Sequence, residues 1–341
     1  MIWAVIVALF LGAPVAAQEA VARFGDGETR MVLRSTTDIR ILAPLMERFA
    51  AANPDLAVEY EQWGSNDLFV ASSGECATGA AGADAILSSA VQQMVWLVNA
   101  ACGFPYKSAQ TATLPPERRW RDELWGVTEE PAVILYNKDR IAGEDVPRSR
   151  FRLLDTMRAD PDLVRGRIAT YDIKASGLGY LFAHVDSQEA NTFGAMLESF
   201  ARVDAVATCC SAEIIEGVAE GRYLIAYNVL GSYVEEARDA KVGVVLPEDY
   251  TLVLSRGFMI PKGAGEKAGA ARLLDFLLSD EARPMLEAAN LRMVAGGDET
   301  GLQLSARRLI PLSPTLLVAL DKNRRETLYG LWENAFDPAQ E

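Results

Sequence analysis

Residues 124–138 read LWGVTEEPAVILYNK and residues 250–261 read YTLVLSRGFMIP, and these two long extended segments decide the fold. Both are rich in the β-branched and aromatic residues that favour strands. A long series of further elements separates them along the chain. We therefore expect the chain to cross from one domain into a second at the first segment and to return at the other, so that the second domain is inserted into the first.

Strands alternate with helices before the first crossing. Residues 30–35, 56–62 and 83–87 are predicted strands, and each runs into a polar turn followed by a helical pattern. The first of these helices begins after Asp38, a good N-cap residue, and ends at Asn53. Three repeats of strand, turn and helix indicate parallel strands with crossover helices, which is an α/β sheet rather than a sandwich.

A second series of elements lies between the crossings, with predicted strands at residues 167–171, 223–229 and 242–246. The expected fold class is therefore α/β, with two α/β domains joined by two crossing strands. The domain boundaries follow from the crossings: lobe 1 is residues 29–128 plus 255–341, and the inserted lobe 2 is residues 129–254.

The amino-terminal residues read as a secretory signal peptide. An apolar run covers residues 2–11, and the small residues 15–17 precede Gln18. The alternative is an uncleaved membrane anchor, but Pro14 interrupts the apolar stretch, which is shorter than the ~20 residues that span a bilayer. Residues 1–17 are therefore expected to be removed, and the mature protein is expected to be exported.

The composition excludes several classes of protein. The chain has 341 residues, with 33 Lys and Arg against 47 Asp and Glu, and its formal net charge of −14 disfavours nucleic acid as a partner. His184 is the single histidine, so no multi-histidine metal site can form. The sequence contains no G-x-S-x-G elbow, no G-x-G-x-x-G run and no P-loop. We expect no enzymatic activity and no cofactor, and a secreted hydrolase is the least favoured alternative.

Because the protein is expected to be exported to an oxidising compartment, its four cysteines can form disulfides. Cys76 lies in a loop-like stretch and Cys102 follows the helical stretch 91–101, so we predict a bridge between them. Two separately buried thiols are the alternative, since cysteine packs well as a small hydrophobe. Cys209 and Cys210 are neighbours that can bond only through a strained turn, so reduced or partly oxidised thiols are expected there.

Polar turns at strand-to-helix junctions are the predicted ligand contacts, because the crevice of an open α/β sheet lies beyond the carboxyl ends of its strands. Hydroxyls and the unsatisfied N–H groups of a helix start can hold an anion, although ordinary helix capping is the alternative for each turn taken alone. Polar groups on the first crossing, and aromatic and amide groups at two strand ends of lobe 2, can orient a ligand in the same cleft. Arg34 and Arg256 could supply a cation, but nothing in the sequence fixes their direction. The candidate residues are Ser35, Thr36, Thr37, Ser65, Asn66, Ser88, Ser89, Thr128, Glu129, Tyr171, Asp172, Ser176, Gly177, Tyr227 and Asn228.

Five stretches carry a resemblance to a known family: RMVLRSTTD (30–38), LWGVTEEPAVILYNK (124–138), RIATYDIKASGLGY (167–180), EGRYLIAYNVLGSY (220–233) and ARLLDFLLSDEAR (271–283). Together with the signal peptide they look like bacterial periplasmic solute-binding proteins of ABC transporters, and the resemblance covers nearly the whole mature chain. It is greatest to the branch that contains ferric-ion binders, hexose-phosphate binders and phosphoglycerate-transport regulatory proteins. The resemblance implies a two-lobed periplasmic binding protein fold of type II that closes over one solute. It also implies a location in the periplasm and delivery to an ABC permease or a sensor kinase, and a monomer suits such a receptor.

The ferric-ion binders of that branch hold iron through an adjacent tyrosine pair in the second lobe. Here the corresponding region reads Ala226-Tyr227-Asn228, and the next tyrosine is Tyr233. Ferric iron needs several hard anionic oxygens, and one phenolate is too few. We therefore expect no bound metal and a small anionic metabolite, phosphorylated or multiply carboxylated, as the ligand. The alternative is a ferric-ion binding protein that recruits Tyr227, Tyr233 and carboxylates such as Glu129.

Overall fold

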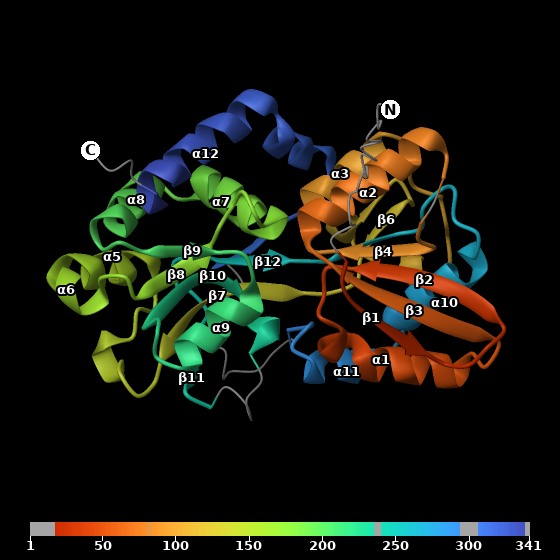
Figure 1. Cartoon of the computed structure of the whole chain (residues 1–341), viewed down its shortest axis with the longest axis horizontal. Coiled ribbons are helices and arrows are strands. Elements are labelled where there is room, and N and C mark those ends of the chain that lie inside the picture. Colours follow the sequence, from red (N-terminus) through yellow and green to blue (C-terminus); the bar gives the residue numbers. More distant parts are fainter. Residues whose placement is uncertain (1–17, 81, 235–239, 294–305, 338–341) are drawn as a thin grey trace, which may run out of the picture.

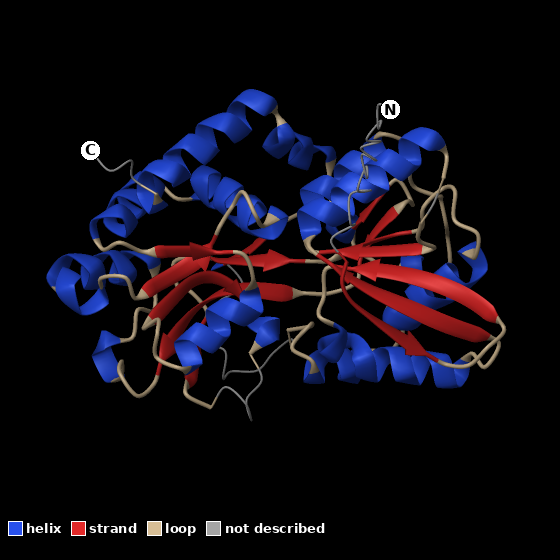
Figure 2. Cartoon of the chain, viewed as in Figure 1, coloured by secondary structure: helices blue, strands red, loops and turns tan. Residues whose placement is uncertain are grey.

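The computed structural model describes residues 18–80, 82–234, 240–293 and 306–337. The predicted signal peptide, residues 1–17, lies outside these ranges. Within them the chain forms two α/β lobes that lie side by side, each built on a seven-stranded sheet with helices packed against it (Figure 1, Figure 2). The α/β fold class and the two-lobed architecture are confirmed. No helix in the described ranges is both long and apolar enough to cross a bilayer.

Lobe 1 contains the predicted repeats of strand, turn and helix. Strand β2 (Thr29–Ser35) pairs in parallel with β3 (Leu56–Trp63) and with β4 (Ala85–Ser88), as predicted. Strand β1 (Gln18–Phe24) is an antiparallel edge strand with no counterpart among the predicted elements. The other strands of this sheet are β5 (Arg119–Trp120), β6 (Leu124–Gly126) and β13 (Gly257–Met259). The helices of lobe 1 are α1 (Ile39–Ala52), α2 (Ser65–Thr78), α3 (Val91–Asn99), α4 (Ala109–Ala112), η1 (Pro116–Arg118), α10 (Lys267–Leu277) and α11 (Arg283–Ala288).

The apolar stripe of α1 holds the first polar turn in place. Five of its side chains recur at helical spacing and are buried in the lobe 1 core, which is worth roughly 1.5–3 kcal/mol for each large side chain. They are Ile41, Leu42, Leu45, Met46 and Phe49. Asn53 is the C-cap, as predicted. Because α1 is anchored in this way, its amino-terminal end stays next to the turn that leaves β2.

Lobe 2 is built on a mixed sheet. Its long strand β7 (Glu130–Asn137) pairs antiparallel with β10 (Ile225–Leu230), while β8 (Ile168–Tyr171) pairs in parallel with β10 and with β9 (Val206–Thr208). The other strands are β11 (Val242–Val245), β12 (Thr251–Leu254) and β14 (Arg307–Leu309). The helices on this side are η2 (Gly143–Asp145), α5 (Arg150–Ala159), α6 (Pro161–Val164), α7 (Gly177–Glu189), α8 (Phe193–Arg202), α9 (Ser211–Ala219) and η3 (Gly231–Tyr233).

Two short joints carry the chain between the sheets. β6 belongs to the lobe 1 sheet and β7 to the lobe 2 sheet, so the first crossing is the segment 127–129. β12 belongs to the lobe 2 sheet and β13 to the lobe 1 sheet, so the second crossing is the segment 255–256. The two predicted extended segments are therefore each divided into two strands, with the change of lobe in between.

The C-terminal segment departs from the predicted division of the chain. Strand β14 pairs with β12 of the lobe 2 sheet. Two further elements follow, η6 (Pro314–Leu320) and α12 (Lys322–Phe336), and α12 packs against α8 with Leu328, Trp332 and Ala335 in the core of lobe 2. The range 255–341 therefore does not belong to lobe 1 as a whole. The apolar stripe of α12 predicts only that one face is buried, and either lobe could have covered it.

The four cysteines form two disulfides. The predicted Cys76–Cys102 bond is present and joins the C-terminal turn of α2 to the residues that follow α3. Cys209 and Cys210 are bonded to each other, so the expectation of reduced or partly oxidised thiols is wrong for this structure. Both residues are exposed in the turn from β9 into α9, where few packing constraints oppose the bond.

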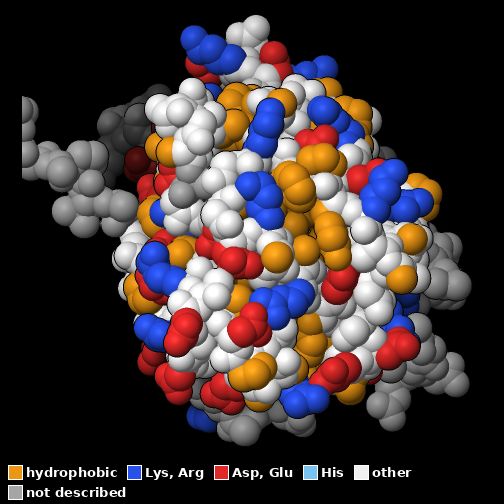
Figure 3. All heavy atoms as spheres, turned by 90° about the vertical axis from the view of Figure 1, so that its right-hand side faces the viewer, with side chains coloured by type: hydrophobic (Ala, Val, Ile, Leu, Met, Phe, Trp, Pro, Cys, Tyr) orange, Lys and Arg blue, Asp and Glu red, His pale blue; other side chains and the backbone are white. Residues whose placement is uncertain are grey.

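The outer end of lobe 1 mixes charges of both signs. Acidic, basic and hydrophobic side chains are interspersed over this face, with no broad area of one kind (Figure 3). The excess of acidic residues in the composition therefore does not collect into a single acidic surface at this end of the molecule.

Candidate functional site

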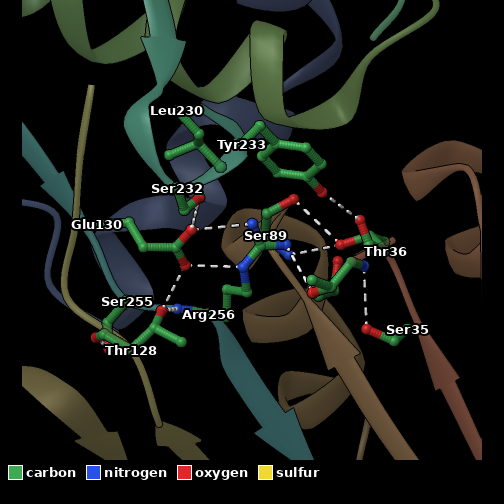
Figure 4. Close-up of polar contacts among 12 residues, drawn as sticks. Ser35, Thr36, Ser89, Thr128, Glu130, Leu230, Ser232, Tyr233, Ser255 and Arg256 are labelled. Carbon is green, nitrogen blue, oxygen red and sulfur yellow. Dashed lines mark hydrogen bonds and ion pairs between the residues drawn. The ribbon is translucent and has the colours of Figure 1, made fainter. Parts of the chain in front are cut away.

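The first and third predicted polar turns of lobe 1, residues 35–37 and 88–89, lie side by side. β2 and β4 are parallel neighbours, so the residues that follow them meet at one edge of the sheet. The Ser89 N–H donates to Thr36 Oγ1 (3.0 Å), and the hydroxyls of Thr36 and Ser89 are 3.1 Å apart (Figure 4). Thr36 is half-buried and Ser89 is buried. These two side chains therefore present hydroxyl groups together, as the spacing of the turns predicts.

The second crossing places a buried cation beside this pair of turns. Arg256 donates through Nε to Glu130 Oε1 (2.7 Å) and through NH2 to Glu130 Oε2 (2.9 Å), and both side chains are almost fully buried. Arg256 NH1 also donates to Thr37 Oγ1 (2.9 Å). Burial alone would lower the pKa of Arg256, but the Glu130 carboxylate outweighs it and the pKa is raised. The guanidinium is therefore a fixed positive charge that links the second crossing to β7 of lobe 2 and to Thr37 of lobe 1.

Lobe 2 contributes hydroxyl groups to the same place. Ser232 Oγ donates to Glu130 Oε2 (2.5 Å), and the Tyr233 hydroxyl donates to the carbonyl oxygen of Thr36 (3.2 Å). Thr128 Oγ1 donates to Glu130 Oε1 (2.7 Å). Burial raises the pKa of Tyr233, so its phenol stays neutral at ordinary pH. We call this set the interlobe cluster: Thr36, Thr37, Ser89, Thr128, Glu130, Ser232, Tyr233 and Arg256 (Figure 4).

Glu129, the predicted carboxylate, does not join the interlobe cluster. Its side chain forms an ion pair with Arg118, and the neighbouring Glu130 takes the place beside Arg256. Successive side chains of an extended segment point to opposite sides, so one residue of register decides which glutamate faces the cluster. The sequence offers two adjacent glutamates and no signal that selects Glu130, which was therefore missed.

Ser65 and Asn66 meet a different part of lobe 2. Asn66 Nδ2 donates to the carbonyl oxygens of Lys174 (2.8 Å) and Ala175 (3.0 Å). The Gly177 N–H donates to Ser65 Oγ (2.9 Å). The structure therefore brings three predicted residues, Ser65, Asn66 and Gly177, together across the lobes, with their polar groups bonded to protein.

Two glutamines at the start of α3 complete this second set of contacts. Gln92 Nε2 donates to the carbonyl oxygen of Gly177 (2.7 Å), and Gln93 Nε2 donates to Asn66 Oδ1 (2.8 Å). Both side chains are buried, which is unusual for glutamine. Neither was predicted, because glutamine inside a helical pattern reads as an ordinary helix former.

Four predicted residues shape their own turns. In each case the side-chain oxygen accepts a hydrogen bond from a backbone N–H two or three residues later, which is the capping alternative recognised for these turns. The bonds run to Ser35 from Thr37 (3.0 Å), to Ser88 from Ala90 (3.2 Å), to Asp172 from Lys174 (2.8 Å) and to Ser176 from Gly179 (3.0 Å). These side chains fix the backbone around the two sets of interlobe contacts.

Tyr227 and Asn228 belong to a buried cluster inside lobe 2. Arg150 Nε donates to the Tyr227 hydroxyl (2.6 Å), which in turn donates to Asp186, and Asn228 Nδ2 donates to Asp186 Oδ2 (2.8 Å). A β-bulge in β10 with Asn228 at φ +55° turns both side chains into this cluster. The strand pattern predicted the strand but not its bulge, so these residues are not brought to the interlobe cluster.

The tyrosines are poorly placed for ferric iron. Burial raises the pKa of Tyr227 well above its ordinary value and also raises that of Tyr171, whose hydroxyl lies 2.6 Å from Ser211 Oγ. A phenolate ligand would have to be formed against this penalty. Among the described residues, no group of three or more His, Cys, Asp or Glu side chains is placed to hold a metal ion.

Comparison with known proteins identifies the relatives of the chain. The family model for bacterial extracellular solute-binding proteins matches residues 81–308. A substrate-binding protein of an ABC transporter from Agrobacterium tumefaciens is 32% identical, with a TM-score of 0.86 over 93% of this chain and 98% of its own. A search of curated proteins found no match.

Two more distant structures share the fold. The apo ferric ion-binding protein A of Pasteurella haemolytica is 18% identical, with a TM-score of 0.70 over 92% of this chain and 100% of its own. The periplasmic binding protein AfuA of Actinobacillus pleuropneumoniae, with fructose-6-phosphate bound, is 15% identical, with the same TM-score and the same coverage. The family match over most of the chain, the relative from Agrobacterium and the two-lobed fold agree, and the chain belongs to the bacterial extracellular solute-binding proteins.

Proposed function

We propose that this solute-binding protein captures a small anionic metabolite, phosphorylated or multiply carboxylated, at the interlobe cluster. The observation that carries the proposal is that the Thr36 and Ser89 hydroxyls meet next to Thr37, whose hydroxyl accepts a hydrogen bond from the buried Arg256 guanidinium. Helices α1 and α3 begin directly after the turns that hold these hydroxyls, and the amino-terminal end of a helix favours negative charge.

The ion pair at the cluster also bears on the kind of anion. Glu130 already balances the charge of Arg256, so an added anion is stabilised by hydroxyls and helix dipoles rather than by a free cation. The Glu130 carboxylate can in turn accept hydrogen bonds from ligand hydroxyls. A sugar phosphate or a hydroxy acid carries both an acidic group and hydroxyl groups. Its acidic group would be held by the protein hydroxyls and helix ends, and its hydroxyl groups would donate to Glu130. AfuA, which shares the fold, was solved with a sugar phosphate.

A thermal-shift panel tests the proposal. A ligand at 100 times its dissociation constant stabilises the native state by about 2.7 kcal/mol, so at least one sugar phosphate, phosphoglycerate, dicarboxylate or tricarboxylate should raise the melting temperature. The double substitution Thr36→Val with Ser89→Ala should abolish that shift. Thr113→Val, which removes an exposed hydroxyl at the end of α4, is the matched control and should retain it.

Two results would contradict the proposal. Ferric ion could be the only member of the panel that raises the melting temperature, which would favour the iron alternative. A shift caused by an organic anion could also survive the Thr36→Val and Ser89→Ala substitutions, which would place the ligand elsewhere.

The location and partner of the receptor are proposed on the same basis. An anion receptor with a removable signal peptide would act in the periplasm as a monomer and deliver its solute to the ABC permease. The relative from Agrobacterium is a substrate-binding protein of an ABC transporter, and this supports the permease over a membrane sensor kinase. Loss of uptake of the identified solute in a permease-deletion strain, with the receptor still produced, is the corresponding test.

A further inference from the structure

The contacts made by α2 and α3 with the loop before α7 form a second junction between the lobes, in addition to the interlobe cluster (Figure 1). Four hydrogen bonds cross it: two from Asn66 to carbonyl oxygens, one from Gln92 to the Gly177 carbonyl oxygen, and one from the Gly177 N–H to Ser65. We call Ser65, Asn66, Gln92, the loop 174–176 and Gly177, the first residue of α7, the latch. Every group in these four bonds is uncharged, and each bond joins protein to protein.

Lobe 2 shapes its half of the latch without help from lobe 1. Asp172 Oδ1 accepts the N–H groups of Lys174 (2.8 Å) and Ala175 (3.4 Å), and the Ser176 N–H donates to the Asp172 carbonyl oxygen (2.8 Å). The Lys174 side chain forms an ion pair with Glu333 of α12. The loop carbonyls are therefore already fixed in direction when Asn66 and Gln92 approach, which reduces the entropy lost on contact.

Gly177 leaves room for this approach. A Cβ atom added to it would lie 2.8 Å from Gln93 Nε2 and 3.0 Å from both Asn66 Oδ1 and Ser65 Oγ. All three neighbours belong to lobe 1, so a side chain at this position obstructs contact between the lobes and not the folding of lobe 2. If the lobe 1 side chains moved aside to accept a methyl group, they would lose the latch hydrogen bonds.

We propose that the latch helps to hold the lobes closed in the absence of solute, whatever solute the interlobe cluster takes. The four hydrogen bonds replace bonds to water, so each shifts the ratio of closed to open molecules by about fivefold rather than locking it. Because its groups are uncharged, this ratio should change little with salt. The receptor then exchanges between two states before any solute arrives, and its apparent affinity depends on the latch as well as on the site.

Amide hydrogen exchange in the solute-free full-length protein tests the proposal. The Gly177 N–H is in the first turn of α7, where no intrahelical acceptor exists, so its protection depends on Ser65 across the junction. The Gly179 N–H is bonded to Ser176 within the same turn and is the internal control. Gln92→Ala should speed exchange at Gly177 by about fivefold and leave Gly179 unchanged. Equally fast exchange at Gly177 in the unmodified protein and in the Gln92→Ala variant would overturn the proposal.

Small-angle scattering of the same solute-free protein gives an independent readout. Gly177→Ala should raise the radius of gyration toward that of an open molecule. Gly194→Ala, which adds a methyl group to α8 with no atom within 4 Å, is the matched control and should scatter like the unmodified protein. A radius for Gly177→Ala equal to that of the control would also overturn the proposal. Neither measurement requires the solute, so failure of the latch and failure of the proposed function are separate outcomes.

Discussion

Arg256 shows how one side chain connects three parts of the molecule. Its guanidinium bonds to Glu130 at the start of β7 and to Thr37 in lobe 1, while Ser232 of lobe 2 bonds to the same glutamate. A buried ion pair of this kind adds little net stability compared with apolar residues, but loss of one partner leaves an unpaired charge in the interior. The pair therefore fixes the second crossing against the start of β7 at the centre of the proposed site.

Removal of one partner should be costly. Glu130→Ala leaves the Arg256 charge buried and unpaired, and we expect the free energy of unfolding to fall by about 3–5 kcal/mol in urea denaturation. Glu59→Ala is the matched control, because its partner Arg30 is largely exposed and such pairs contribute about 0–1 kcal/mol. Equal losses in the two variants would show that Arg256 finds water or another partner.

At the scale of elements, α2 and α3 form a braced pair that carries the lobe 1 half of the latch. The Cys76–Cys102 disulfide joins the pair at its C-terminal ends. The bond from Gln93 to Asn66 joins the N-terminal ends. Between these ties, the rings of Phe69 and Trp96 pack edge to face with their centroids 5.3 Å apart. We therefore expect the two helices to behave as one rigid unit.

Removal of the Cys76–Cys102 disulfide should lower the free energy of unfolding. Replacing Cys76 and Cys102 by serine opens the loop between them, and the chain-entropy model gives a loss of about 3–4 kcal/mol in the free energy of unfolding. The control is the same replacement at Cys209 and Cys210, whose bond joins neighbours and closes almost no loop. Denaturation midpoints without reductant compare the two variants. An equal change in both would contradict the loop-closure explanation.

At the scale of the whole molecule, the C-terminal segment bridges the lobes a further time. η6 contacts α3 of lobe 1, and the carbonyl oxygen of Ala319 in η6 accepts a hydrogen bond from Tyr180 of lobe 2. α12 then packs on α8, and within α12 the tilted rings of Trp332 and Phe336 have their centroids 4.8 Å apart. The last described segment, 306–337, therefore packs mainly with the inserted lobe, although the chain left that lobe at the second crossing.

This assignment of α12 can be tested with two adjacent residues. Trp332 is 7% exposed in the lobe 2 core, whereas Leu331 is 47% exposed. Trp332→Ala should lower the free energy of unfolding by about 3–5 kcal/mol and speed amide exchange in α8 but not in α1. Leu331→Ala should change stability by no more than about 0.5 kcal/mol. Faster exchange in α1 instead of α8 would show that α12 packs with lobe 1, as the sequence analysis predicted.

The periodicity of apolar residues predicted those features of the fold that depend on residues close together in the sequence. The strand β2, the apolar stripe of α1 and the two crossings follow from residues close in sequence, because burial of one face repeats with the period of the element. The meeting of Thr36 with Ser89 follows as well, since parallel neighbouring strands end at the same edge. The family resemblance pointed to the same two-lobed fold, which the structure confirms, and the family match confirms the family.

The sequence by itself determined the α/β class, the two lobes, the Cys76–Cys102 pairing and the turns that surround the proposed site. Only the tertiary structure decided that Glu130 rather than Glu129 meets Arg256 and that Tyr227 turns into the core of lobe 2. The physical reason is that a strand shifted by one residue, or bulged by one, reverses the direction of its side chains without changing its composition. A contact between the lobes depends on the side-chain directions of both contacting segments, and no pattern of neighbouring residues predicts both.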